Sequence, residues 1–310
     1  MLPGSLVTMA KRDGLGKSLE VFVLLAGLLL CYVPSKGVTM TLWEAAILGI
    51  VQGATEYLPV SSSGHLVLVP AFLGLEKGPF VFDILVQLGT LVGVLIYFRL
   101  ELFSIVQHML RGLRTKEPLG TWQARYGWWV GVATIPAAGL GLALHDTVEE
   151  AFSSPRMTLG FLFCTAVLLF LGERFGSRVR DHETVGVRDA LVIGCAQVLA
   201  LFPGVSRSGS TIAAGMIRGL TRDAAARFSF LMSIPVMVGA GAVALVDVIR
   251  EPELFHEHGA AILVGFLTAA ISGYIVIHWF LKFLQNRSLN YFAAYCAVVS
   301  ILGFIGLELS

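Results

Sequence analysis

The amino-acid sequence predicts an all-α polytopic membrane protein built as an inverted-topology repeat, each half a re-entrant helical hairpin plus three transmembrane helices. Composition indicates the membrane class, because 56% of the 310 residues are hydrophobic and 14% are charged, against about 25% charged residues in soluble proteins. Six apolar runs are long enough to span a bilayer. A segment interrupted by Pro, Gly and Ser occurs twice at an offset of 145 residues, and paired broken segments are typical of inverted repeats.

The N-terminal 39 residues stand outside this symmetry. Lys11, Arg12 and Lys17 precede an apolar run over 21–33, which is typical of a signal peptide or of an extra span. A third interpretation is that Met40 is the true start. The remaining residues, 40–310, are predicted to form one integral membrane domain with repeats at about 41–172 and 189–308.

The apolar runs and the charges between them predict a topology. Basic residues gather in 99–126 and 173–188, whereas 145–156 and 250–258 are acidic. The positive-inside rule therefore places the first two segments in the cytoplasm and the last two outside. The predicted spans are 81–98, 127–144, 157–172, 226–249, 260–281 and 291–308.

The two repeat segments, at 41–74 and 189–219, are too interrupted to be ordinary spans. Each has two short apolar stretches around a polar break, which predicts a hairpin whose tip is buried in protein or in a watery cavity. The charge bias makes the two hairpins enter from opposite faces, so their tips are expected to meet near the midplane. Identical residues at the offset of 145 are Gly49/Gly194, Gln52/Gln197, Val60/Val205, Ser61/Ser206, Ser63/Ser208 and Gly64/Gly209.

The chemistry is expected at these tips. Glu56 and Arg207 are ionisable groups at membrane depth, where a charge is costly unless it faces a partner or a polar cavity. Such a pair can serve packing alone, as a structural ion pair. Hydroxyl groups surround it, and hydroxyls with free N–H groups at a helix N-terminus form an anion site. The predicted anion-binding residues are Ser61, Ser63, Ser206, Ser208 and Thr211, with the Arg207 guanidinium suited to phosphate.

Two further arrangements on the first tip suggest catalysis. His65 follows Ser62 by three residues, so the two side chains are expected on one helix face, as nucleophile and base. Gln52 and Glu56 lie four residues apart and could hold a divalent cation, Mg²⁺ or Ca²⁺, that bridges phosphate oxygens. The alternative for both Gln52 and its repeat mate Gln197 is a hydrogen bond to backbone freed by the hairpin bend.

At these residues the chain resembles the undecaprenyl-diphosphate phosphatase family, the bacitracin-resistance membrane proteins. The first family motif reads Gln52-Gly-Ala-Thr-Glu56-Tyr-Leu-Pro-Val-Ser-Ser-Ser-Gly-His65, and the second reads Pro203-Gly-Val-Ser-Arg-Ser-Gly-Ser-Thr211. The likeness runs from about Met40 to the C-terminus. It implies that Glu56, Ser62, His65 and Arg207 are catalytic, with Gln52, Ser61, Ser206 and Thr211 in support. Gln at position 52, where the motif allows Glu, leaves the metal with one carboxylate.

The resemblance also implies an activity and a location. It implies hydrolysis of undecaprenyl diphosphate to the monophosphate with a divalent cation, in the bacterial inner membrane with the site facing the exterior, which recycles the lipid carrier for peptidoglycan synthesis. Either Ser62 attacks the phosphorus or His65 activates a water. The alternative function is a lipid-phosphate flippase that uses the same midplane anion site, because broken half-helices in inverted repeats also occur in transporters.

Other partners are constrained by composition. The net charge of +1 and the lack of a basic stripe argue against nucleic acid. The four cysteines lie in apolar runs without CxxC spacing and are expected to be inert thiols. The expected partners are a polyprenyl diphosphate lipid and the bilayer, while a homodimer stays open.

Overall fold

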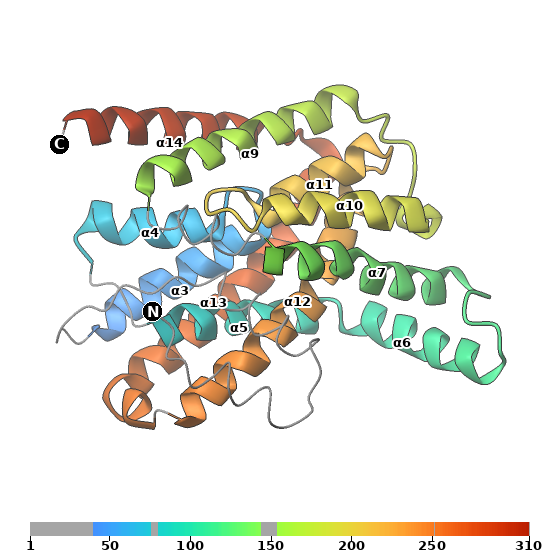
Figure 1. Cartoon of the computed structure of the whole chain (residues 1–310), viewed down its shortest axis with the longest axis horizontal. Coiled ribbons are helices and arrows are strands. Elements are labelled where there is room, and N and C mark those ends of the chain that lie inside the picture. The colour runs from blue at the N-terminus through green and yellow to red at the C-terminus, as the bar shows by residue number, and fades with distance from the viewer. Residues whose placement is uncertain (1–39, 76–79, 144–153, 251, 310) are drawn as a thin grey trace.

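The computed structural model describes residues 40–75, 80–143, 154–250 and 252–309 (Figure 1). These residues form helices and no β-strand, as the sequence predicts. The N-terminal extension at 1–39 lies outside the described residues, so its three interpretations remain predictions. The same holds for most of the acidic segment predicted at 145–156.

The helices follow one another with short connections. The first half contains α3 (Leu42–Tyr57), α4 (Ser62–Leu73), α5 (Phe80–Tyr97), α6 (Arg99–Arg114), α7 (Trp122–Ala143) and α9 (Pro155–Phe175). After the short 3-10 helix η1 (His182–Thr184), the second half contains α10 (Val187–Leu199), α11 (Arg207–Ile217), α12 (Arg222–Arg250), α13 (Pro252–Asn286) and α14 (Asn290–Leu309).

Both predicted hairpins are broken helices, as expected. In the first, α3 ends at Tyr57 and α4 begins at Ser62, and in the second α10 ends at Leu199 and α11 begins at Arg207. Thr41 starts α3 with a capping box, in which its hydroxyl accepts from the Glu44 N–H and its own N–H donates to the Glu44 carboxylate. The interruption in each sequence therefore separates two half-helices.

The prediction that 99–126 is only a connecting loop is wrong, because its first half forms helix α6. The axis turns by 76° between Phe82–Tyr97 and Arg99–Arg114. Leu100, Phe103 and Leu110 are all more than half exposed on α6, while basic residues occupy other positions along the same helix. The segment is an amphipathic helix, and its many charges concealed the helical spacing of its apolar residues.

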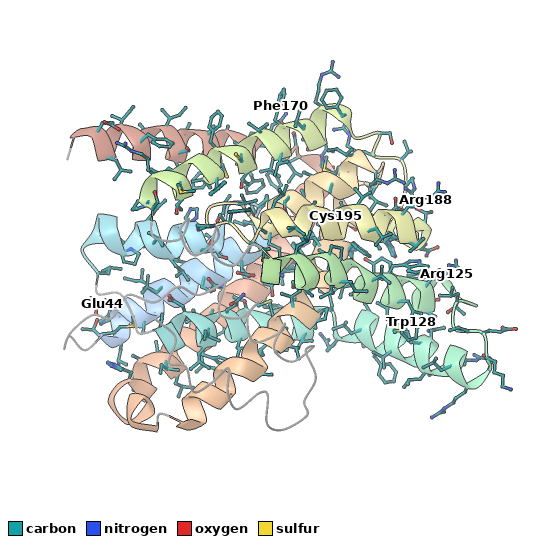
Figure 2. The ribbon with its side chains drawn as sticks, in the orientation of Figure 1. Glu44, Arg125, Trp128, Phe170, Arg188 and Cys195 are labelled. Atoms are coloured by element: carbon teal, nitrogen blue, oxygen red, sulfur yellow. The ribbon has the colours of Figure 1, made fainter. Side chains whose placement is uncertain are left out.

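Four of the six predicted spans fall within α9, α12, α13 and α14, the span at 81–98 passes the end of α5 by one residue, and the described part of the span at 127–144 falls within α7. By length and apolar composition, three of the described helices can cross a membrane, at Pro155–Phe175, His258–Asn286 and Asn290–Glu308, or four if the bent pair counts as one span. Large apolar side chains are exposed on the outside, such as Phe170 on α9, 53% exposed (Figure 2). Such a surface suits a multi-pass membrane protein.

The hairpin helices pack closely on helices from the other half of the chain. α3 lies against α13, and α10 lies against α7 (Figure 1). Glycine allows both approaches, since a Cβ on Gly49 would overlap the backbone of Gly265, and a Cβ on its repeat mate Gly194 would overlap Ala133. The same position in each repeat thus makes the same kind of contact, and both contacts bring the hairpins toward the centre of the bundle.

Buried carboxylates fix the end of the bundle where α10 begins. Asp189 accepts from Arg180 at 2.7 and 3.1 Å and from Arg218 Nε at 2.9 Å. Glu173 accepts from Arg222 Nε and Nη2, both at 2.7 Å. The Asp189 pairs join α10 to the loop after α9 and to the end of α11, and the Glu173 pair joins α9 to α12. Arg125 and Arg188 lie at this end and Glu44 lies at the opposite one (Figure 2).

Candidate active site

The two hairpin tips meet, as the sequence predicts. Ser208 Oγ, on the second tip, donates to the carbonyl oxygen of Leu58 on the first at 2.9 Å. Each tip is closed by an N-cap serine: Ser61 Oγ accepts from the Gly64 N–H at 3.4 Å, and Ser206 Oγ accepts from the Gly209 N–H at 3.0 Å. These two caps occupy equivalent positions in the repeat, so the duplicated Ser and Gly residues have a structural role.

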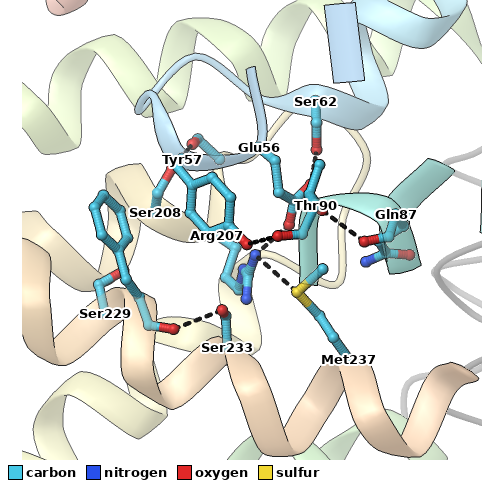
Figure 3. Close-up of polar contacts among 12 residues, drawn as sticks. Glu56, Tyr57, Ser62, Gln87, Thr90, Arg207, Ser208, Ser229, Ser233 and Met237 are labelled. Carbon is cyan, nitrogen blue, oxygen red and sulfur yellow. Dashed lines mark hydrogen bonds and ion pairs between the residues drawn. The ribbon is translucent and has the colours of Figure 1, made fainter. Parts of the chain in front are cut away.

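Glu56 is the centre of the site (Figure 3). Its side chain is 5% exposed, and its Oε1 is paired with Arg207 Nη2 across the two tips. Its Oε2 accepts from Gln52 Nε2 at 2.9 Å and from Ser62 Oγ at 2.7 Å. A buried carboxylate needs such donors to remain charged. The structure therefore brings four of the predicted residues into one hydrogen-bonded cluster.

The two terminal nitrogens of the Arg207 guanidinium differ in their hydrogen bonding. While Nη2 is bonded to Glu56, its Nη1 is buried and has no hydrogen-bond partner among the described residues. Met237 Sδ, 4.0 Å from Nη2, is a weak contact. An unsatisfied buried guanidinium N–H is costly, and an incoming anionic oxygen would satisfy it. The arrangement provides a buried cationic donor that an anion could bind.

His65 does not pair with Ser62, contrary to the expectation from their spacing. Its Nδ1 lies 2.8 Å from the Ser61 carbonyl oxygen, and its Nε2 lies 2.6 Å from Tyr295 Oη. Because a carbonyl oxygen only accepts, Nδ1 carries the proton and Nε2 accepts from the phenol. Ser62 turns instead toward the Glu56 carboxylate, which is a stronger, charged acceptor.

The hydroxyls predicted to bind substrate are mostly engaged with the protein itself. Ser61, Ser206, Ser208 and Thr211 are at most 2% exposed. Thr211 Oγ1 donates to the Arg207 carbonyl oxygen at 2.7 Å. Ser63 is half-buried, and its Oγ lies 3.3 Å from Ser61 Oγ. These hydrogen bonds hold the tips in shape, and direct substrate contact by these residues stays a prediction.

Gln52 and Glu56 are the residues predicted to hold a cation shared with a phosphorylated ligand. No group of three or more His, Cys, Asp or Glu side chains that could hold a metal occurs in the described part of the chain. Glu56 offers one carboxylate and Gln52 one carboxamide, and these two are in contact. Mg²⁺ is commonly held by one or two carboxylates with substrate phosphates supplying further oxygens. Gln52 presents its amide nitrogen to Glu56, so its oxygen would have to turn toward an ion, and the cation stays a prediction.

Sequence reasoning missed two residues that contact the tips and misjudged a third. Tyr295 bonds His65, and Thr165 Oγ1 accepts from the Ser206 N–H at 2.9 Å. A tyrosine or threonine within an apolar span carries no signal of such a contact. The predicted backbone hydrogen bond of Gln197 is wrong, because both amide atoms are buried without a partner in the described structure.

The fold and site together define a multi-pass membrane enzyme of the phosphatase class. A family model described as "Bacitracin resistance protein BacA" matches residues 45–302, and the chain belongs to this family. Similar curated proteins, each named undecaprenyl-diphosphatase, come from Gemmatimonas aurantiaca, Corynebacterium glutamicum and Methanobrevibacter smithii. The first is 42% identical over 86% of this chain and 97% of its own. The other two are 40% identical over 86% of this chain and 90% and 98% of theirs.

Proposed function

We propose that this protein hydrolyses undecaprenyl diphosphate to undecaprenyl phosphate and inorganic phosphate, recycling the lipid carrier for cell-wall synthesis and conferring bacitracin resistance. The observation that carries the proposal is the contact of Ser62 Oγ with a carboxylate whose other oxygen pairs with Arg207. A carrier of lipid phosphates needs charge complementarity, but it does not need a serine hydroxyl that donates to a buried carboxylate. The names of the curated relatives agree with hydrolysis.

In the proposed reaction, Arg207 binds the terminal phosphate through Nη1, which has no partner among the described residues. Ser62 Oγ attacks the terminal phosphorus and gives its proton to Glu56, at 2.7 Å. The bond from phosphorus to the bridging oxygen breaks, and undecaprenyl phosphate leaves with the electron pair. Water then cleaves the phosphoserine, which releases inorganic phosphate and returns the serine proton. Arg207 neutralises charge that spreads over the equatorial oxygens.

In this assignment Glu56 is the base that accepts the Ser62 proton, whereas the spacing of Ser62 and His65 suggests His65. Its only lone pair, on Nε2, accepts from Tyr295, so Glu56 is the better-placed acceptor for the Ser62 proton. The competing route, in which His65 activates a water, needs Nε2 to give up its hydrogen bond with the Tyr295 phenol. A phosphoenzyme trapped on Ser62 would favour the serine route, and its absence during turnover would favour water.

The predicted cation belongs to the proposal as well. Glu56 and Gln52 would hold Mg²⁺ or Ca²⁺ together with phosphate oxygens, and the bound ion would add positive charge beside the transferred phosphoryl group. Wild-type protein that releases phosphate at full rate in excess chelator would remove the cation from the proposal.

We also propose that the halves are inverted repeats and that the enzyme sits in the bacterial inner membrane with its site open to the exterior. The exchange of packing partners, α3 on α13 and α10 on α7, supports the first statement, since a two-fold related pair of halves would make both contacts. Arg125 and Arg188 share one end of the bundle, opposite Glu44 (Figure 2), as the charge-based topology requires.

The decisive experiment measures phosphate release from undecaprenyl diphosphate by purified protein in detergent, without vesicles or nucleotide. Wild-type protein should turn over, and Glu56→Gln should lose at least about a hundredfold in kcat. Arg156→Lys, which keeps a cation at an exposed ion pair with Glu308, serves as the control and should retain activity. Absence of turnover by well-folded wild-type protein would overturn the proposal and leave the flippase as the surviving alternative.

A further inference from the structure

We propose that Tyr295 is a positioning residue for His65, because its phenol determines which imidazole nitrogen carries the proton and how the ring is oriented. Tyr295 lies on α14, far in sequence from the first hairpin. Its Oη is 2.6 Å from His65 Nε2. The two rings are also stacked, with centroids 5.7 Å apart and planes inclined by 14°. The contact thus restrains His65 by both a hydrogen bond and ring packing.

The imidazole is held at both nitrogens. His65 is 8% exposed, so each nitrogen needs a partner in the protein. Nδ1–H donates to the Ser61 carbonyl oxygen at 2.8 Å, and Nε2 is left as an acceptor that the phenol satisfies. Without the Tyr295 hydroxyl, Nε2 would be a buried acceptor with no donor. The ring would then gain by rotating or by moving its proton to Nε2.

Each hairpin tip is also held by a side-chain hydrogen bond to its backbone, and these two bonds are equivalent in the repeat. Cys296 Sγ, on α14, donates to the Pro59 carbonyl oxygen at 3.7 Å. Thr165 Oγ1, on α9, donates to the Gly204 carbonyl oxygen at 3.0 Å. Pro59 and Gly204 are equivalent positions in the repeat. Helices α14 and α9 therefore support the first and second tips through matching contacts to the backbone.

The phenol–imidazole pair is an addition to this shared scaffold. The residue before Thr165 is Cys164, which is exposed. Ser210, the repeat mate of His65, donates to the Arg207 carbonyl oxygen at 3.1 Å. Among the described residues the pair thus occurs only at the tip that carries the carboxylate and the serine. A contact needed merely to hold a tip would be expected at both, so the asymmetry points to a role in the reaction.

Tyr295 is more exposed than His65, as expected of a residue that positions the imidazole and covers it. Tyr295 is 43% exposed, whereas His65 is buried. A group that approaches Nε2 from outside must first displace the phenol. Tyr295 therefore restricts access to the one lone pair of the imidazole and preserves the hydrogen bond of Nδ1–H to the backbone at Ser61, where α4 begins.

The effect on turnover rests on the proposed phosphatase function, whereas the effect on the imidazole does not. The test compares Tyr295→Phe, which keeps the ring but removes the hydroxyl, with Tyr291→Phe as a matched control. Tyr291 lies on the same helix and is 60% exposed. ¹⁵N-histidine NMR in nanodiscs reports the imidazole, and His65→Gln assigns its signals. Phosphate release from undecaprenyl diphosphate reports kcat and KM.

Tyr295→Phe should shift the His65 ¹⁵N signals and lower kcat about tenfold while KM stays within about twofold. In the His65→Gln background it should change kcat less than about twofold, because the phenol acts through the imidazole. Tyr291→Phe should match wild type in both measurements. If wild-type protein releases no phosphate, the proposed function fails, and the NMR comparison still decides whether Tyr295 orients His65.

Three results would overturn the proposal. Unchanged His65 signals in Tyr295→Phe would show that the phenol does not control the imidazole. Shifted signals with unchanged kcat would reduce the pair to a structural contact. An equal loss of kcat in the wild-type and His65→Gln backgrounds would show that Tyr295 acts by another route.

Discussion

Arg207→Ala is predicted to remove anion binding, while Glu56→Gln is predicted to strengthen it even as it stops catalysis. The Arg207 guanidinium donates to Glu56 through Nη2, and its Nη1 is buried without a partner among the described residues. An incoming phosphate oxygen satisfies Nη1 and competes with the carboxylate for the cation. The two substitutions therefore change binding in opposite directions.

The magnitudes follow from the burial of the pair. The Glu56 and Arg207 side chains are 5% and 17% exposed, so the estimate for exposed ion pairs, about 0–1 kcal/mol, does not apply. Removing one partner of a buried charge pair costs about 2–5 kcal/mol of binding, or about 30-fold to 4,000-fold in Kd. A carboxylate and a phosphate charge about 5 Å apart repel by about 3 kcal/mol at an effective dielectric constant of 20. Allowing for lost orientation of Arg207, Glu56→Gln should tighten binding at least about tenfold.

The assay is calorimetric titration in detergent with an isoprenyl methylenediphosphonate, which lacks the scissile bridging oxygen, in excess chelator. Arg156→Ala is the control, because Arg156 is 63% exposed and pairs only with the exposed Glu308 among the described ion pairs, and its Kd should equal that of wild type. The reasoning would be refuted if Arg207→Ala bound the ligand within about threefold of wild type, or if Glu56→Gln weakened binding in chelator.

Three further predictions test other parts of the structure. Replacing the chelator with millimolar Mg²⁺ in this titration should tighten binding by wild-type protein and leave the Glu56→Gln variant unchanged; equal responses would argue against a carboxylate-held cation. Ser62→Ala should lower phosphate release at least about a hundredfold, and near-normal release would rule out Ser62 as the nucleophile. Gly53→Ala should lower the free energy of unfolding in detergent by more than about 3 kcal/mol, and with it the melting temperature. The reason is that its Cβ would overlap Ser272 and nearby backbone. Gly131→Ala, with nothing within 4 Å of its Cβ, should be neutral, and equal melting temperatures would refute the packing argument.

The sequence predicts the local events at the tips well, because they depend on neighbours in the chain. Ser61 and Ser206 cap the half-helices as their positions before Gly64 and Gly209 suggest. The pairing of Glu56 with Arg207 was also predictable, since a charge at membrane depth demands a partner. Both results follow from strong, short-range requirements that single residues reveal.

The choice among acceptors could not be predicted in this way. Ser62 and His65 have the spacing of a nucleophile and base, yet Ser62 donates to Glu56 and His65 accepts from Tyr295. Spacing along a helix shows which side chains could meet, but each side chain bonds the strongest acceptor or donor that packing brings near it. Those competitors come from α3 and α14, and a lone tyrosine in an apolar span gives no sign of its partner.

The sequence by itself determined the helical membrane class, the two broken hairpins and the residues that carry charge at their tips. These features arise from composition, periodicity and the free-energy cost of burying charge, which act on each segment separately. Only the tertiary structure decided which helix covers each tip, that Arg207 retains an unpartnered donor, and that Glu56 rather than His65 receives the Ser62 hydroxyl. These features depend on how each hairpin folds back on itself and on packing between helices that are distant in sequence, where small residues such as Gly49 and Gly194 let backbones approach closely.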